Sequence, residues 1–290
     1  MLDVASLGRA QERLAALGCR VKPYYTPEQK FQRFAAPDAL RADLLQAAAA
    51  DPEVNVVLAL RGGYGMSRLL PLLDIPALAA SGKLFCGYSD FTALHMALLK
   101  EGRASFSSPM ISDDFSCETL SALTLPDFWR CLNGPQHQVS WAAKEPAQID
   151  LSGTLWGGNL AMFSHLVGSP YLPAIEGGIL FFEDIAEHPY RVERMLLQLH
   201  FSGILARQKA IVLGDFSAYQ LSAFDNGYDF DQMLAYVRSQ LSIPVITGLP
   251  FGHIRDKVTL VIGSQARLWS DADGVHLLMR DYPNLGDAGC

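Results

Sequence analysis

The sequence lacks the features that mark nucleic-acid-binding and membrane proteins. It has no cluster of Lys and Arg, and its 23 basic and 30 acidic residues give a formal net charge of −7, which argues against nucleic acid as the main partner. No apolar run approaches the roughly 18 residues that a transmembrane helix needs, and the first residues show neither the basic nor the apolar region of a signal peptide. We therefore expect no nucleic-acid or membrane partner and a cytoplasmic location, with a periplasmic location as the alternative if a leader is missing from this chain.

Paired cysteines and metal-binding motifs are absent too. The five cysteines are widely spread and form no CxxC pair, so neither a disulfide scaffold nor a zinc ribbon is indicated. No HExxH motif occurs, which leaves a catalytic metal without support. We expect reduced thiols and a protein that uses no metal and no cofactor.

The 290 residues are instead rich in apolar side chains. Half of them are hydrophobic and 18% are charged, which is enough for a large buried core. In the first half, strand-like runs alternate with amphipathic helices. We expect helices over residues 2–17 and 38–50, strands over 54–60 and 84–88, and a helix from 89 to about 100. This alternation predicts an open parallel sheet covered by helices.

The second half begins after a polar segment. Residues 134–150 contain Pro135 and Pro146, a composition typical of a linker. The elements expected beyond it are a strand over 178–184, a helix from Pro189 through His200, a strand over 209–213, and antiparallel strands over 258–262, 266–270 and 275–279. We therefore expect an α/β protein with an N-terminal parallel-sheet domain over residues 1–135, a linker over 136–152, and a C-terminal mixed α/β domain with antiparallel strands over 153–290.

Ser89 stands where a nucleophile would be exposed. It follows a short apolar strand and precedes a helix, in Gly87-Tyr-Ser-Asp-Phe-Thr92. A serine at such a turn projects its hydroxyl above the carboxyl edge of a sheet, and the N–H of Asp90 lies at a helix N-terminus, where the dipole favours a developing oxyanion. The Arg61-Gly-Gly-Tyr-Gly65 loop also ends a strand, and the N–H of Gly63 is a candidate second donor. The alternatives are a helix N-cap role for Ser89 and a purely structural turn at the glycines.

Two further residues complete a possible catalytic set. Glu183 comes at the end of an apolar strand, which places a carboxylate at the functional edge of a sheet. His253 lies in a loop whose conformations Pro250 and Gly252 restrict. Taken alone, Glu183 is better interpreted as a solvated acid and His253 as a polar surface residue. Together with Ser89, they follow the chain order Ser, Glu, His of a possible serine hydrolase triad.

Seven stretches of the sequence form long, ordered motifs: RGGYGMSRLLPLLD (61–74), GYSDFTALH (87–95), SPM (108–110), GTLWGGNLAM (153–162), GILFFEDIAEHPYRVERMLLQL (178–199), RQKAIVLGDFS (207–217) and SIPVITGLPFGH (242–253). They make the chain resemble a known family, the LD-carboxypeptidases of peptidase family S66, which include the murein tetrapeptide carboxypeptidases. The resemblance extends over nearly the whole chain.

The resemblance implies roles for these residues. It makes Ser89 the nucleophile, Glu183 the acid and His253 the base, with the N–H groups of Gly63 and Asp90 as oxyanion donors. The implied reaction removes the terminal D-Ala from the murein tetrapeptide L-Ala-γ-D-Glu-mDAP-D-Ala, where mDAP is meso-diaminopimelate, in peptidoglycan recycling.

The resemblance also implies an architecture. It predicts an N-terminal parallel α/β domain, a C-terminal domain with its own β-structure, an active site between them, and often a homodimer. Family members normally begin with a strand before the first helix, whereas this chain opens almost directly on that helix. We therefore expect the first strand of the sheet to be missing or altered.

A substrate with several carboxylates calls for Arg side chains or backbone donors. The candidate substrate-binding residues are Arg61, Tyr64, Trp156, Asn159, Arg191 and Arg194. The structural alternatives are solvated or acid-paired arginines and a core position for Trp156. Two other functions stay open: an S66 relative that cleaves peptidyl-nucleotide amides and so gives antibiotic immunity, and a non-catalytic α/β binding protein.

Overall fold

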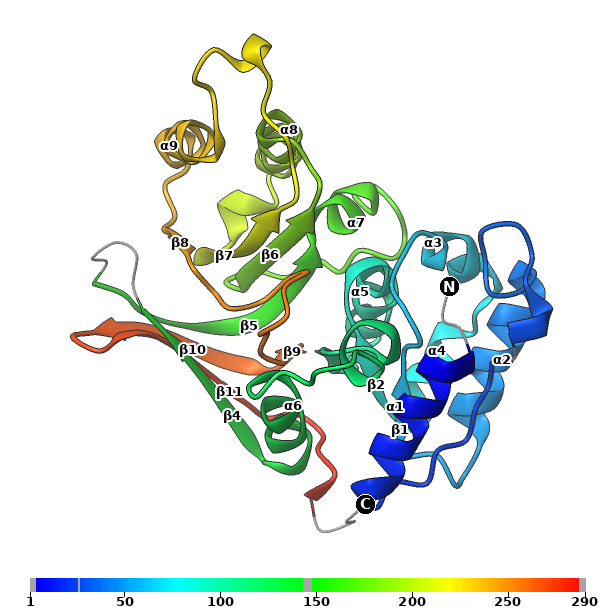
Figure 1. The fold of residues 1–290 in the computed structure, drawn as a ribbon. Helices are drawn as coiled ribbons and strands as arrows, with labels where there is room; N and C mark the ends of the chain where they lie inside the picture. Colours follow the sequence, from blue (N-terminus) through cyan, green and yellow to red (C-terminus); the bar gives the residue numbers. More distant parts are fainter. Residues whose placement is uncertain (1–3, 26, 143–147, 287–290) are drawn as a thin grey trace.

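The computed structural model describes residues 4–25, 27–142 and 148–286, which form two β-sheets with covering helices (Figure 1). The first sheet has the strand order β1-β2-β3-β9. Strands β1 (Val56–Leu58), β2 (Leu84–Gly87) and β3 (Ser105–Ser107) run parallel, and β9 (Leu260–Ile262) pairs antiparallel with β3. The expected parallel sheet is confirmed, and its fourth strand comes from near the other end of the chain.

The second sheet has seven strands and changes character at its centre. Its order is β4-β11-β10-β5-β6-β7-β8. Strands β4 (Gln136–Trp141), β11 (Gly274–Arg280), β10 (Gln265–Asp271) and β5 (Asp150–Asn159) are antiparallel, while β5, β6 (Ile179–Ile185), β7 (Ala210–Ser217) and β8 (Val245–Thr247) are parallel. The expected mixed sheet with antiparallel C-terminal strands is confirmed.

The segment that we expected to be a linker contains a strand. The alternation of exposed and buried residues along β4 is that of a half-buried strand, and this strand forms an outer edge of the seven-stranded sheet by pairing with β11. Its polar residues lie on the exposed face, which is why composition alone suggested a linker. Residues 143–147 lie outside the described part of the chain.

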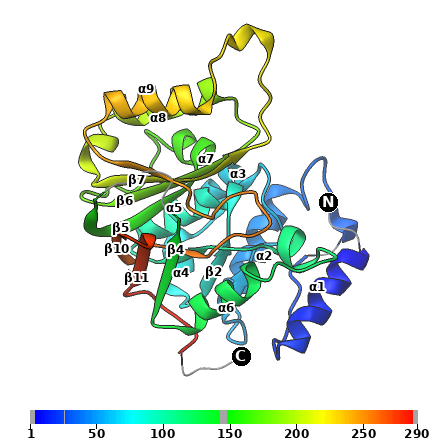
Figure 2. The same ribbon diagram turned by 60° about the vertical axis from the view of Figure 1, so that its left-hand side comes forward.

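The helices cover the sheets as their apolar faces require. The first half contributes α1 (Val4–Ala16), α2 (Asp38–Ala50), α3 (Met66–Leu69), α4 (Ile75–Ala80), α5 (Thr92–Lys100) and α6 (Thr124–Asn133), and the second half α7 (Leu160–His165), α8 (Pro189–Phe201) and α9 (Phe230–Gln240). Helix α8 begins at Pro189, as expected, and buries Val192, Leu196 and Leu199. Helices α8 and α9 pack side by side over the parallel half of the large sheet (Figures 1 and 2).

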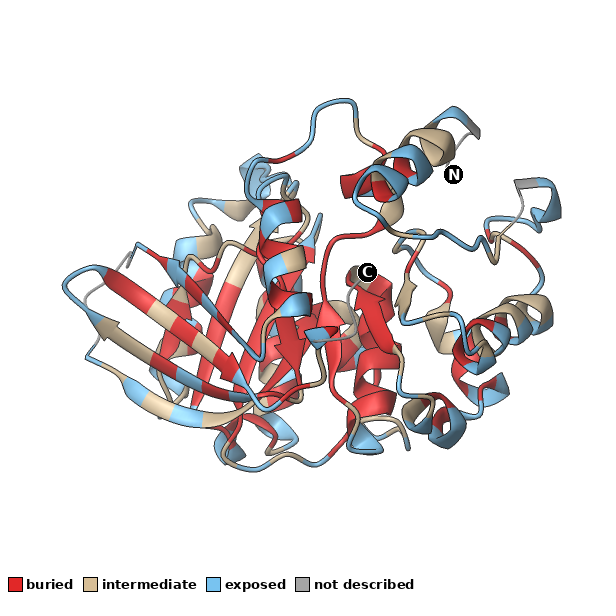
Figure 3. Cartoon of the chain, turned by 90° about the horizontal axis from the view of Figure 1, so that it is seen from below, coloured by how far each residue is buried: buried red, intermediate tan, exposed pale blue. Residues whose placement is uncertain are grey.

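Helix α5 joins the two halves. It is buried from Thr92 to Leu99 and contacts β3 of the small sheet, β5 of the large sheet and α7. Buried residues gather in the strands and the central helices (Figure 3), whereas in α1 only Ala10 and Leu14 are buried among the residues whose side chains are described. The element that follows Ser89 is therefore held rigidly between the two sheets. In the part of the chain that the structure describes, every helix is too short or too polar to cross a bilayer.

Candidate active site

Ser89 lies at a sharp turn between β2 and α5. Its φ is +62°, a left-handed conformation that a non-glycine residue adopts only under constraint, at a cost of about 1–3 kcal/mol. The short helical turn η3 (Ser89–Phe91) starts there, and its N-cap is Tyr88. The alternative N-cap role for Ser89 is therefore wrong, and the turn presents its hydroxyl to other parts of the chain.

The structure brings the three predicted triad residues together. His253 Nδ1 is 2.8 Å from Glu183 Oε2, and His253 Nε2 is 3.1 Å from Ser89 Oγ. With the carboxylate ionised, Nδ1–H donates to Glu183, so Nε2 is free to accept the proton of the Ser89 hydroxyl. Each residue comes from a different element: the end of β2, the end of β6, and the loop between β8 and β9.

A buried polar network holds Glu183. Its side chain is completely buried, and Asn159 Nδ2 donates to Glu183 Oε1 at 3.2 Å and to Asp184 Oδ1 at 2.9 Å. The register of β6 against β7 shifts between Phe182 and Asp184, which breaks the alternation of faces and brings two consecutive acids within reach of one amide. Asn159 thus fixes the position of Glu183, and Glu183 in turn fixes the position of His253.

The electrostatics of the network favour a proton on His253. Burial lowers the pKa of His253, but the hydrogen bond and charge of Glu183, helped by the charges of Asp184 and Asp113, outweigh it and raise the pKa above its ordinary value of 6.5. Burial first, and then the charge of Glu183, raise the pKa of Asp184 to about 6. The imidazole is therefore a stronger base than a free histidine, as a proton acceptor for a serine should be.

The Arg61–Gly65 loop passes directly over Ser89. A Cβ on Gly62 would lie 2.8 Å from Ser89 Cβ and 3.1 Å from Ser89 Oγ, so only glycine fits. The next residue, Gly63, has a φ of +97°, which glycine adopts freely. Asp90 Oδ2 accepts from the N–H of Met66 at 2.6 Å, which ties the end of the loop to the turn that begins at Ser89. The backbone of both predicted oxyanion donors thus lies beside Ser89.

The predicted substrate-binding residues divide into three groups. Trp156 belongs to the core, since its side chain is buried and its Nε1–H donates to Gln208 Oε1 at 3.0 Å; this is the core position that we gave as its alternative role. Asn159 is buried and faces the carboxylates. The exposed residues are Arg61, Tyr64, Arg191 and Arg194.

Among these exposed residues, Arg61 and Tyr64 both lie on the Arg61–Gly65 loop. The Tyr64 side chain is 52% exposed, and the Arg33 guanidinium carbon lies 6.0 Å from the centre of its ring. On α8, Arg191 lies 3.7 Å from Glu187, the acid pairing that we gave as its alternative role. Tyr64 and Arg61 are therefore the two candidates on the loop whose backbone passes over Ser89.

Two residues of the site were not expected from the sequence. Asp184 shares Asn159 with Glu183, and the signal for it was the pair of consecutive acids at the end of a buried strand. Tyr88 is buried, and its ring centre lies 5.0 Å from that of His253. No sequence signal separates such a tyrosine from an ordinary core residue.

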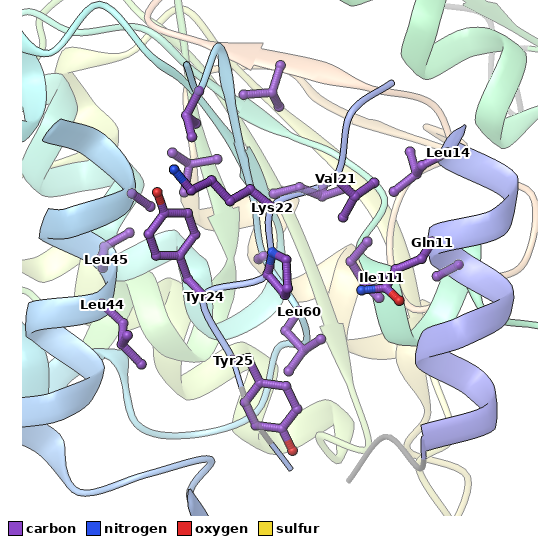
Figure 4. Close-up of a pocket in the computed structure, with 18 of the residues that line it drawn as sticks. Gln11, Leu14, Val21, Lys22, Tyr24, Tyr25, Leu44, Leu45, Leu60 and Ile111 are labelled. Atoms are coloured by element: carbon purple, nitrogen blue, oxygen red, sulfur yellow. The ribbon is translucent and has the colours of Figure 1, made fainter. Parts of the chain in front are cut away.

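A cavity of about 580 Å³ lies in the N-terminal half and is distinct from this site (Figure 4). Its walls are α1, α2, residues 18–25 and the strand β1, and neither Ser89, Glu183 nor His253 lines it. Within the described residues, α1 is the first element and β1 is an edge strand that pairs only with β2. The cavity therefore adjoins the free edge of β1.

Known proteins share this architecture and sequence. Residues 2–108 match the LD-carboxypeptidase N-terminal domain, and residues 152–268 match the LD-carboxypeptidase C-terminal domain. The crystal structure of a muramoyltetrapeptide carboxypeptidase from Oxalobacter formigenes superposes with a TM-score of 0.94 at 53% identity, covering 98% of this chain and 97% of that one.

Curated relatives agree. A putative carboxypeptidase of Streptomyces coelicolor is 36% identical over 89% of this chain and 82% of its own length. A murein tetrapeptide carboxypeptidase of Pseudomonas aeruginosa is 30% identical over 83% of this chain and 78% of its own length. The chain belongs to the LD-carboxypeptidases of peptidase family S66.

Proposed function

We propose that this protein is a serine carboxypeptidase that removes the terminal D-Ala from the murein tetrapeptide during peptidoglycan recycling, with Ser89, Glu183 and His253 as its triad. One observation carries the proposal. His253 lies between the hydroxyl of Ser89, whose backbone is strained, and the buried carboxylate of Glu183, within hydrogen-bond distance of both. The names of the similar proteins from Oxalobacter formigenes and Pseudomonas aeruginosa support the choice of substrate.

The proposed reaction has two steps. His253 Nε2 takes the hydroxyl proton of Ser89 as Oγ attacks the carbonyl carbon of mDAP, and Glu183 stabilises the imidazolium. The N–H groups of Gly63 and Asp90 donate to the oxyanion. His253 then gives the proton to the departing nitrogen of D-Ala, which leaves an acyl ester on Ser89. His253 then deprotonates a water molecule, which attacks the ester. The ester bond breaks, the tripeptide is released, and His253 gives the proton to Ser89 Oγ.

The leaving D-Ala carries a free carboxylate next to the bond that breaks. Arg61 and Tyr64 lie on the loop that passes over Ser89, so this loop offers a cation and a phenol hydroxyl close to the chemistry. Arg191 and Arg194 on α8 are the second candidate pair. Replacing Arg61 with Gln should raise KM for the tetrapeptide, and an unchanged KM would remove Arg61 from substrate binding.

The experiment compares wild type with Ser89→Ala on purified disaccharide tetrapeptide, with EDTA present. Release of D-Ala by wild type alone supports the proposal, and release by both proteins removes Ser89 from the mechanism. If neither releases D-Ala, an aminoacyl sulfamoyl adenylate is the next substrate, because cleavage of peptidyl-nucleotide amides is the alternative activity. If neither substrate is cleaved, a non-catalytic binding protein remains.

The architecture and setting belong to the same proposal. Residues 1–135 would supply the nucleophile and residues 153–290 the acid and base, in a homodimer that acts in the cytoplasm. The resemblance to the family supports the dimer and the location. Light scattering of the purified protein and fractionation of cells that produce it would test them.

A further inference from the structure

A buried lysine lies four residues after the catalytic base. Lys257 is on the same loop as His253, is only 2% exposed, and forms an ion pair with Asp114, which is also buried. The backbone N–H of Lys257 donates to Thr124 Oγ1 at 2.9 Å. Lysine is almost never buried without such a partner. The pair therefore ties the loop that carries the base to the other half of the molecule.

Asp114 connects this lysine to the Arg61–Gly65 loop, which carries the proposed oxyanion donor Gly63. Its second oxygen, Oδ2, accepts from the backbone N–H of Met110 at 2.9 Å. The methyl group of Met110 would lie 3.2 Å from a Cβ on Gly62, so Met110 packs against the loop that contains Gly63. The Asp114 carboxylate thus restrains two loops. Its Oδ1 holds Lys257 on the loop that carries His253, and its Oδ2 holds Met110, which packs against the Arg61–Gly65 loop.

Tyr88 connects the lysine to the triad. It directly precedes Ser89, and its buried ring has Lys257 Nζ 5.0 Å from its centre and the His253 ring 5.0 Å from its centre. A cation over an aromatic face is attracted to it. The ring therefore contacts the base and the lysine at once, next to the nucleophile.

We propose that Lys257 and Asp114 are positioning residues for the reaction: their ion pair holds Tyr88 against His253 and fixes the distance between His253 and Ser89. The inference rests on the proposed triad. A loop histidine without this support would sample positions out of reach of the serine hydroxyl, and misplacement by about 1 Å can cost on the order of 100-fold in rate. A pair that only stabilised the fold would change the melting temperature and leave catalysis unchanged.

The main variant is the double substitution Lys257→Met with Asp114→Asn, which leaves no buried charge unpaired. We expect it to fold, to lower kcat for D-Ala release at least tenfold, and to change KM less than twofold. We also expect wild type to show a downfield NMR resonance of the His253 Nδ1 proton, because this proton lies between His253 and Glu183, and we expect this resonance to broaden or disappear in the variant. Tyr88→Leu keeps both charges and removes the ring, and the same two changes are expected.

Two controls separate positioning from stability and from charge. Arg267→Met with Asp150→Asn removes an exposed ion pair between β10 and β5 with the same change in charge, and should leave kcat unchanged. Leu277→Ala opens a cavity in the buried part of β11 and should lower stability without lowering kcat.

The outcomes are distinct. If a folded double variant keeps the wild-type kcat and the His253 resonance, Lys257 and Asp114 only stabilise the fold and the inference is overturned. If the double variant does not fold, Tyr88→Leu decides by the same two measurements. If wild type releases no D-Ala, or Ser89→Ala still does, the proposed function fails instead; the NMR resonance then still tests the positioning, because it needs no substrate.

Discussion

Replacing Glu183 with Gln tests the triad most sharply, because the structure dictates which way the new amide will turn. Asn159 Nδ2 donates to Glu183 Oε1, so the glutamine keeps its oxygen on that side. Its NH₂ group must then face His253 Nδ1, which the wild-type carboxylate accepts from at 2.8 Å. The proton of the neutral imidazole then moves to Nε2, and Nδ1 accepts from the glutamine NH₂. A protonated Nε2 cannot accept the proton of the Ser89 hydroxyl.

The expected loss follows from this wrong tautomer. An acid-to-amide change at the equivalent place in a serine protease triad costs about 10⁴-fold in kcat, which corresponds to about 5 kcal/mol at 1.36 kcal/mol per factor of ten. The pH profile should change as well. In wild type, kcat/KM should fall as the pH drops through a pKa of His253 that lies above 6.5. Without the charge of Glu183, this acidic limb should move to lower pH.

The assay measures D-Ala release from the disaccharide tetrapeptide between pH 5 and 9, with circular dichroism to confirm the fold. The variant replaces a buried charge with a neutral group of the same size, so it should stay folded. A kcat within tenfold of wild type, or an acidic limb that does not move, would refute the assignment of Glu183 as the partner of His253.

Three further variants test other parts of the structure. Gly62→Ala places a methyl group 2.8 Å from Ser89 Cβ and should lower kcat more than tenfold while the melting temperature changes little; normal turnover would show that the loop moves freely. Phe163→Ala removes a buried ring that packs against Trp156 and Phe182 and should cost about 3–5 kcal/mol in urea unfolding. Asp184 has its pKa raised from 3.8 to about 6 in the fold, so its contribution favours folding below pH 4 and is lost as the pH rises through 6, by about 3 kcal/mol at 1.36 kcal/mol per pH unit. In Asp184→Asn, the free energy of unfolding should therefore fall less between pH 4.5 and pH 7 than it does in wild type. An equal fall in both proteins, measured by urea unfolding at the two pH values, would contradict this role of Asp184.

Periodicity and end signals were enough to place most elements. The apolar stripe of α8 and the proline at its start predicted a helix that the structure begins at Pro189. The strands expected over 266–270 and 275–279 are β10 and β11, which pair antiparallel. Periodicity and end signals are local properties, which depend on neighbours in the chain. Strand β4 was missed because it is an edge strand with a polar outer face, and its pairing with β11 depends on residues far along the chain.

In the candidate site, too, some features follow from local sequence signals and others depend on residues far apart in the chain. Ser89, Glu183 and His253 were singled out because each follows a strand, but their meeting depends on how two sheets are placed, which no local pattern contains. The role of Asn159 as a donor to Glu183 was not foreseen. It depends on the bulge between Phe182 and Asp184, which has no signature in composition. Trp156 was a candidate for the substrate with a core position as its alternative, and its burial favours the core position.

Strand β9 has a consequence for how the protein is made. It completes the small sheet by pairing with β3, although the two strands are separated by more than half of the chain. On the ribosome, the first three strands emerge long before their fourth neighbour is synthesised, and β3 waits with an open edge to which other chains can pair. The loop that carries His253 is the segment that crosses to β9. His253, the proposed base, can therefore reach Ser89 only after the chain beyond β8 has been synthesised, so a chain that ends before it should have no peptidase activity.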